Sequence, residues 1–69
     1  MQHQTAQRIA GLIYDAARRR FEAVVEFFAP GLPEPMRVPV ALHAPESLPH
    51  PVLARALLAE AQRRGIGPR

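Results

Sequence analysis

Residues 20–28 alternate strictly between two kinds of side chain, and this alternation constrains the fold more than any other feature. With a period of two, one side carries Phe21, Ala23, Val25 and Phe27, and the other Glu22, Val24, Glu26 and Phe28. Such alternation is typical of a β-strand with one side on a hydrophobic core and the other partly in water. The stretch holds three of the four aromatic residues of the chain, so we expect it at the centre of the core.

The preceding segment, residues 8–14, is rich in β-branched and aromatic residues and is predicted to pair with this strand. Residues 15–19 would form a five-residue hairpin loop, in which the Asp15 carboxylate can accept backbone N–H bonds. This loop length fixes the register, with the expected opposite pairs Ile9–Val25, Gly11–Ala23 and Ile13–Phe21 on the inner side, and Tyr14–Arg20 and Leu12–Glu22 on the outer side.

A third strand is predicted over residues 36–43. The preceding segment 29–35 contains three prolines and a glycine, a composition typical of a turn. Because proline has no backbone N–H, Pro39 predicts an edge strand, which leaves residues 20–28 in the middle of the sheet. Antiparallel pairing would place Val38 opposite Val25, Val40 opposite Ala23 and Arg37 opposite Glu26.

Residues 51–64 have the composition and boundary residues of a helix. Pro51 suits the first helical position, Gly65 suits the residue after the end, and arginines in the last turn complement the helix dipole. Leu53 and Leu57 are the expected contacts with the sheet.

The predicted fold class is therefore α+β: a three-stranded antiparallel meander, 8–14, 20–28 and 36–43, with the helix across its inner side. We expect one small domain over residues 1–69, with 1–7 and 66–69 flexible. The expected core consists of Ile9, Ile13, Phe21, Ala23, Val25, Phe27, Val38, Val40, Leu42, Leu53 and Leu57.

An all-α fold is the alternative. Apolar residues between positions 6 and 28 also recur at helical spacing, and Thr5 could cap such a helix. The chain would then be two helices joined by a proline-rich linker. We favour the sheet because the strand over 36–43 would otherwise have no partner in its own chain.

Residues 8–23, Arg-Ile-Ala-Gly-Leu-Ile-Tyr-Asp-Ala-Ala-Arg-Arg-Arg-Phe-Glu-Ala, resemble the opening hairpin of short conserved-hypothetical bacterial proteins. In those proteins a Tyr-Asp turn and a Phe-Glu-Ala strand are followed by another strand and a closing helix. The resemblance implies the same order of elements and carries no established activity.

The length and composition restrict the class of protein further. A chain of 69 residues without cysteine has neither a disulfide framework nor a thiolate metal site, so self-association is an expected source of stability. The net charge of +3 is only a mild bias toward polyanions. No stretch approaches a membrane span, and the expected compartment is the cytoplasm. The arginine-rich, lysine-free composition fits a GC-rich bacterial genome.

No motif predicts catalysis, a cofactor or a metal. Ser47 and Thr5 have no base at a diagnostic spacing, so neither is an expected nucleophile. His43, Glu46 and His50 have metal-ligand chemistry within eight residues, but their spacing matches no zinc signature. We therefore expect no enzyme activity, no cofactor and no metal site.

Two surfaces are candidates for binding. An apolar outer side carrying Leu12, Tyr14, Val24 and Phe28, next to an open edge strand, predicts a homodimer, and the leading hypothesis is a non-catalytic interaction module whose protein partner beyond itself is unknown. The alternative is an accessory nucleic-acid binder that uses Arg18, Arg19 and Arg20 at the hairpin, joined by Arg55, Arg63 and Arg64 if they gather on one side.

Overall fold

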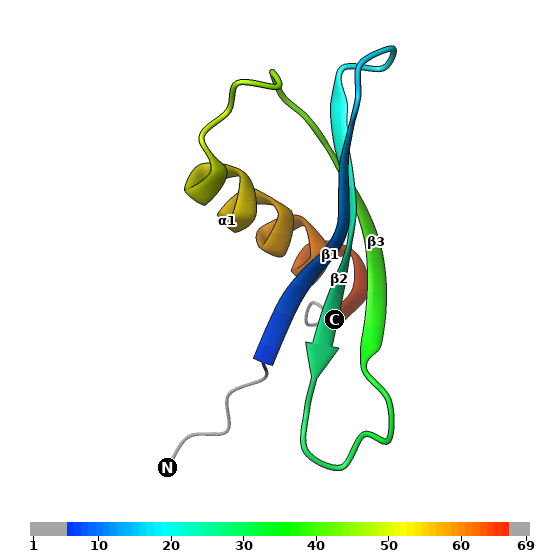
Figure 1. Cartoon of the computed structure of the whole chain (residues 1–69). Coiled ribbons are helices and arrows are strands. Elements are labelled where there is room, and N and C mark those ends of the chain that lie inside the picture. Colours follow the sequence, from blue (N-terminus) through cyan, green and yellow to red (C-terminus); the bar gives the residue numbers. More distant parts are fainter. Residues whose placement is uncertain (1–5, 67–69) are drawn as a thin grey trace.

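The computed structural model describes residues 6–66 and shows a three-stranded antiparallel sheet followed by a helix (Figure 1). The elements are β1 (Ala6–Asp15), β2 (Arg20–Phe28), β3 (Met36–His43), α1 (His50–Ala61) and a short π-helical segment, η1 (Gln62–Ile66). The strands lie in the order β1-β2-β3, so β2 is central. The predicted α+β meander is confirmed, and the all-α alternative is wrong.

Helix α1 lies on one side of the sheet, which we call the inner side (Figure 1), and it packs mainly against β3. The alternating residues of β2 and two leucines of α1 meet there. Val25 and Leu57 are fully buried. The complete core consists of Phe21, Ala23, Val25, Phe27, Val38, Val40, Leu53, Leu57 and Ala61. All of these residues except Ala61 were predicted to belong to the core. The prediction succeeded in β2 and β3 because the period of two is unbroken there.

The pairing of β2 with β3 has the predicted register. Val25 lies opposite Val38, Ala23 opposite Val40, and Glu26 opposite Arg37. Pro39 lies on the edge strand, as its missing backbone donor requires. The alternation along both strands therefore determines which side chains reach the core.

The pairing of β1 with β2 departs from the predicted register after Ala10. Ile9 lies opposite Val25 as expected, but Gly11 and Leu12 together oppose one residue of β2, which is a β-bulge. Gly11 has φ +63°, a backbone conformation that glycine adopts without strain. The loop is correspondingly one residue shorter than predicted, residues 16–19.

The bulge reverses the sides of the β1 residues that follow it. Tyr14 now lies opposite Phe21, and Ile13 lies opposite Glu22. The prediction that Ile13 belongs to the core is therefore wrong, and its side chain is 56% exposed. Ile9 and Leu42, also expected in the core, are half-buried and pack against it.

The helix begins and ends slightly earlier than predicted. It starts at His50, so Pro51 occupies its second position, and the regular α-helix stops at Ala61. Arg63 and Arg64 belong to η1 instead of the last turn of α1. Of the residues expected to be flexible, 6 and 7 are part of β1 and 66 ends η1, whereas 1–5 and 67–69 lie outside the described residues.

Candidate interaction surface

The side of the sheet opposite α1 is the outer face. It is formed by alternate residues of the three strands, whose order follows from the two registers. Its residues are Ala6, Arg8, Ala10, Ile13 and Asp15 of β1, Arg20, Glu22, Val24, Glu26 and Phe28 of β2, and Arg37, Pro39, Ala41 and His43 of β3. The face is mixed in character, with apolar side chains in its middle and ion pairs on either side of them.

Two of the four predicted interaction residues lie on the outer face. Val24 is half-buried there, and Phe28 is 38% exposed. Leu12 and Tyr14 lie on the inner side instead, because the bulge shifts them, and both pack against the core. The ring of Tyr14 meets the ring of Phe21 edge-to-face, with centroids 4.8 Å apart. Their predicted place in an outer patch is wrong.

Ile13 takes their place on the outer face, and the sequence interpretation missed it. Among the large hydrophobic residues over 6–64 it is the most exposed. The signal that could have identified it is Gly11, because a glycine within a strand often marks a bulge.

A cluster of three charged side chains crosses the sheet at one end of the outer face. Glu26 accepts a hydrogen bond from Arg37 Nε at 3.0 Å through Oε2, and its Oε1 forms an ion pair with Arg8 Nε at 3.1 Å. The carboxylate side chain is only 9% exposed, whereas the two arginine side chains are 67% and 59% exposed. The buried carboxylate therefore holds two exposed guanidinium groups in place.

A shallow hollow of about 560 Å³ lies beside the bulge on the outer face. Its apolar lining includes Ile13, Val24, Pro39 and Ala41, and Arg20 and Arg64 also line it. The bulge produces the hollow's wall at β1, because Gly11 has no side chain to fill it. A partner that covers this face would have to fill the hollow.

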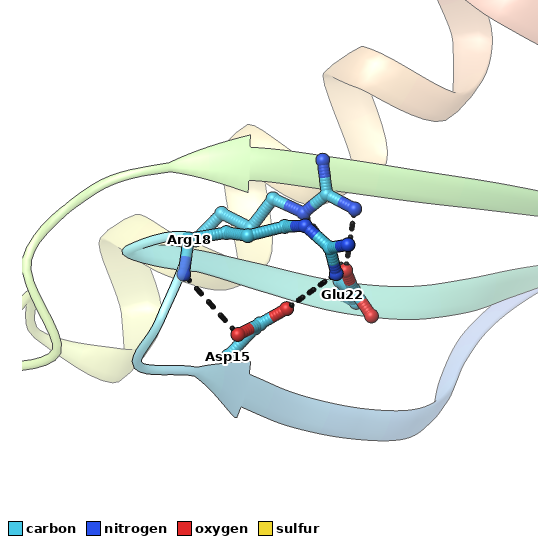
Figure 2. Close-up of polar contacts among 4 residues, drawn as sticks. Asp15, Arg18 and Glu22 are labelled. Carbon is cyan, nitrogen blue, oxygen red and sulfur yellow. Dashed lines mark hydrogen bonds and ion pairs between the residues drawn. The ribbon is translucent and has the colours of Figure 1, made fainter.

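The hairpin turn is held by local polar contacts (Figure 2). The Asp15 carboxylate accepts from the Arg18 backbone N–H at 3.2 Å and from Arg18 Nη1 at 3.1 Å. These contacts, led by the backbone hydrogen bond, lower the pKa of Asp15. Arg20 donates through Nε to Glu22 at 2.8 Å. The predicted role of Asp15 in the turn is confirmed.

The predicted polyanion-binding arginines are mostly neutralised by neighbouring carboxylates. Arg18 pairs with Asp15, and Arg20 pairs with Glu22. At the other end of the chain, Arg63 and Arg64 both pair with Glu60. Arg20 and Arg64 line the same hollow. Within residues 6–66, the two arginines that form no ion pair are Arg19, at the hairpin tip, and Arg55, on α1.

The structure brings together no further chemical site in the described residues. Over 6–66, no three histidine, acidic or cysteine side chains gather as a metal site would require. His43 lies opposite Arg20, and His50 is the first residue of α1. None of the helices in this part of the chain has the length and apolar composition that crossing a membrane requires.

Comparisons of the chain with protein-family models, with curated proteins and with solved structures give no match. The function of the chain is therefore inferred from the residues and geometry of the outer face.

Proposed function

We propose that the protein is a small, non-catalytic interaction module that forms a homodimer through its outer face. The observation that carries this proposal is the exposure of Ile13 and Phe28 on the outer face of the sheet, 56% and 38% respectively. Apolar side chains rimmed by charged ones are typical of an association surface. A second copy of the chain would cover these side chains and the hollow beside Ile13.

The dimensions of the chain support this proposal. The radius of gyration is 12.9 Å, compared with about 11 Å for a compact domain of the same length. The molecule is elongated, with a longest extent of 41 Å. A core of this size usually supplies only about 3–5 kcal/mol of stability. Burial of the outer face in a dimer would add to that.

The charged groups of the outer face support a binding role over a catalytic one. Glu22 and Glu26, the two carboxylates of β2 on this face, are both paired with arginines. A general base must be free to accept a proton from a substrate, whereas these carboxylates already accept from guanidinium groups. They orient arginines on the surface, which suits recognition of a partner.

Sedimentation equilibrium of the wild type and of Ile13→Lys tests the proposal. We expect the wild type to approach the mass of a dimer at high micromolar concentration, and Ile13→Lys to remain near the monomer mass. The new ammonium group would lie opposite Glu22, so the fold should persist while the apolar contact is lost. Val52→Lys is the matched control, because Val52 is 41% exposed on α1 and away from the outer face.

The control variant should dimerise like the wild type. A wild-type protein that stays monomeric at high micromolar concentration would disprove the proposal, and so would loss of the dimer in both variants. The alternative function, nucleic-acid binding through Arg18, Arg19 and Arg20, has less support because two of these arginines are paired with acids. It predicts a gel shift of DNA or RNA that weakens with added salt.

A further inference from the structure

The outer face is arranged in rows that run across the three strands. One row is charged, with Glu26 between its two arginines, and the next is the apolar row of Ala10, Val24 and Pro39. The row after that contains Ile13, Glu22 and Ala41. A positive row and a row with an acidic centre therefore lie on either side of an apolar one.

The positive row has unused hydrogen-bonding capacity. Each of its guanidinium groups forms an ion pair with Glu26 through Nε, and an arginine has five N–H donors. The row contains two positive charges and one negative charge, so it can accept one more anion. Because Glu26 already fixes the two guanidinium groups, an added carboxylate would meet donors that lose little freedom on binding.

The carboxylate of Glu22 is suited to this position. Glu22 lies on β2, as Glu26 does, and the two residues are equally far from Val24 at the centre of the face. Glu22 and Glu26 are each two residues from Val24, which is about 7 Å along a strand. The side chain of Glu22 is 31% exposed and is held by Arg20. A two-fold axis that lies in the plane of the interface, runs across the strands and passes over Val24 would therefore place Glu22 of one copy above the positive row of the other.

We propose that two copies of the chain pack outer face to outer face about this axis, with Glu22 of each copy bound by Arg8 and Arg37 of the other. The inference rests on the proposed dimer and specifies its register. The middle rows of the two copies then meet over Val24. Two equivalent ionic contacts form per dimer, one at each side of the axis, as the symmetry of an isologous interface requires.

Single cysteines in the cysteine-free chain test this register. In face-to-face packing two sheets lie about 10 Å apart, so cysteines on the axis come within reach of a short bifunctional maleimide. We expect Val24→Cys to crosslink to a covalent dimer. Phe28→Cys is the matched control on the same strand and face, because four residues on each side of the axis separate its two copies by about 27 Å, and it should not crosslink.

The ionic contact has its own test. Glu22→Gln keeps the size of the side chain and removes its charge, and we expect the dimer to dissociate about tenfold more readily and to lose most of its salt sensitivity. Glu34→Gln is the control, because Glu34 lies in the exposed turn between β2 and β3. It should leave the dimer unchanged.

The outcomes separate this inference from the proposed function. A wild-type dimer that crosslinks through residue 28, or through neither position, would overturn the register and leave the proposed dimer standing. A Glu22→Gln variant that dimerises like the wild type would overturn the ionic contact. A wild-type monomer at every concentration would remove the dimer itself, and the register with it.

Discussion

At Gly11 the backbone has φ +63°, a left-handed conformation that costs a residue with a Cβ about 1–2 kcal/mol. This one residue allows the bulge in β1 and so decides that Ile13 faces solvent and Tyr14 faces the core. A Cβ added to Gly11 would meet no atom within 4 Å. The requirement for glycine here is therefore one of backbone conformation and involves no steric conflict with neighbouring atoms.

We expect Gly11→Ala to reduce the free energy of unfolding by about 1 kcal/mol, because the strain of the left-handed backbone is partly offset by a stiffer unfolded chain. Gly11→Asn should cost less, since asparagine tolerates this conformation better than alanine does. Urea unfolding of the two variants beside the wild type measures the difference. Equal losses for alanine and asparagine would show that φ at residue 11 is not the cause.

At the scale of elements, the C-terminal end of α1 is tied to η1 through one carboxylate. Glu60 accepts from Arg64 Nε at 3.0 Å and also from Arg63. The hydrogen bond from Arg64, with that from Arg63, lowers the pKa of Glu60. A lowered pKa in the folded state means that the folded chain binds this proton less readily than the unfolded chain does.

This contribution to stability is present above the unfolded pKa of glutamate, about 4.3, and is lost as the pH falls through the lower folded value. Acidification should therefore lower the urea midpoint of the wild type more than that of Glu60→Gln, because only the wild type loses this contribution. The comparison is between neutral pH and a pH below the folded pKa of Glu60. Glu34→Gln, in the exposed turn, should follow the wild-type curve. An equal fall of the urea midpoint on acidification in the wild type and in Glu60→Gln would contradict this explanation.

The elements differ in how far the sequence determines them. The β2–β3 register was predictable because hydrophobic alternation and Pro39 agree on one arrangement. The β1 register was predictable only as far as Ala10, since the length of the loop was inferred without allowing for a bulge at Gly11. The end of α1 was misplaced by three residues because Arg63 and Arg64 suit a last α-helical turn as well as they suit η1.

At the scale of the whole molecule, the core is expected to give a single chain only a small free energy of unfolding. Leu57 is fully buried between α1 and the sheet, and truncating such a leucine to alanine costs about 2–5 kcal/mol. That range matches the about 3–5 kcal/mol expected of the whole core. Without association, a single truncation at this position would be enough to unfold most of the chain.

We expect Leu57→Ala to be largely unfolded at low micromolar concentration and to regain structure as the concentration rises, because the proposed dimer would stabilise only the folded chain. Far-ultraviolet circular dichroism at several concentrations measures this. Leu58→Ala is the control, since Leu58 is only partly buried, and it should remain folded throughout. A Leu57→Ala variant that is fully folded at every concentration would contradict a marginal core.

The outer face as a whole was only partly predictable. Val24 and Phe28 follow from the alternation of β2 alone, which needs no knowledge of the neighbouring strands. Ile13 and the hollow depend on the bulge, and Glu26 is buried only because Arg8 and Arg37 reach it from the strands on both sides. Properties of this kind arise from pairing across the sheet, so no single stretch of sequence displays them.

The two edges of the sheet limit how large an assembly of this chain can become. β1 is interrupted by its bulge, and β3 carries Pro39, which has no N–H to offer a neighbouring strand. Both features hinder the addition of further strands at either side. In the proposed dimer each outer face is covered by the other copy, so no outer face would remain free to add a third chain, and we expect no growth into fibres in a concentrated solution.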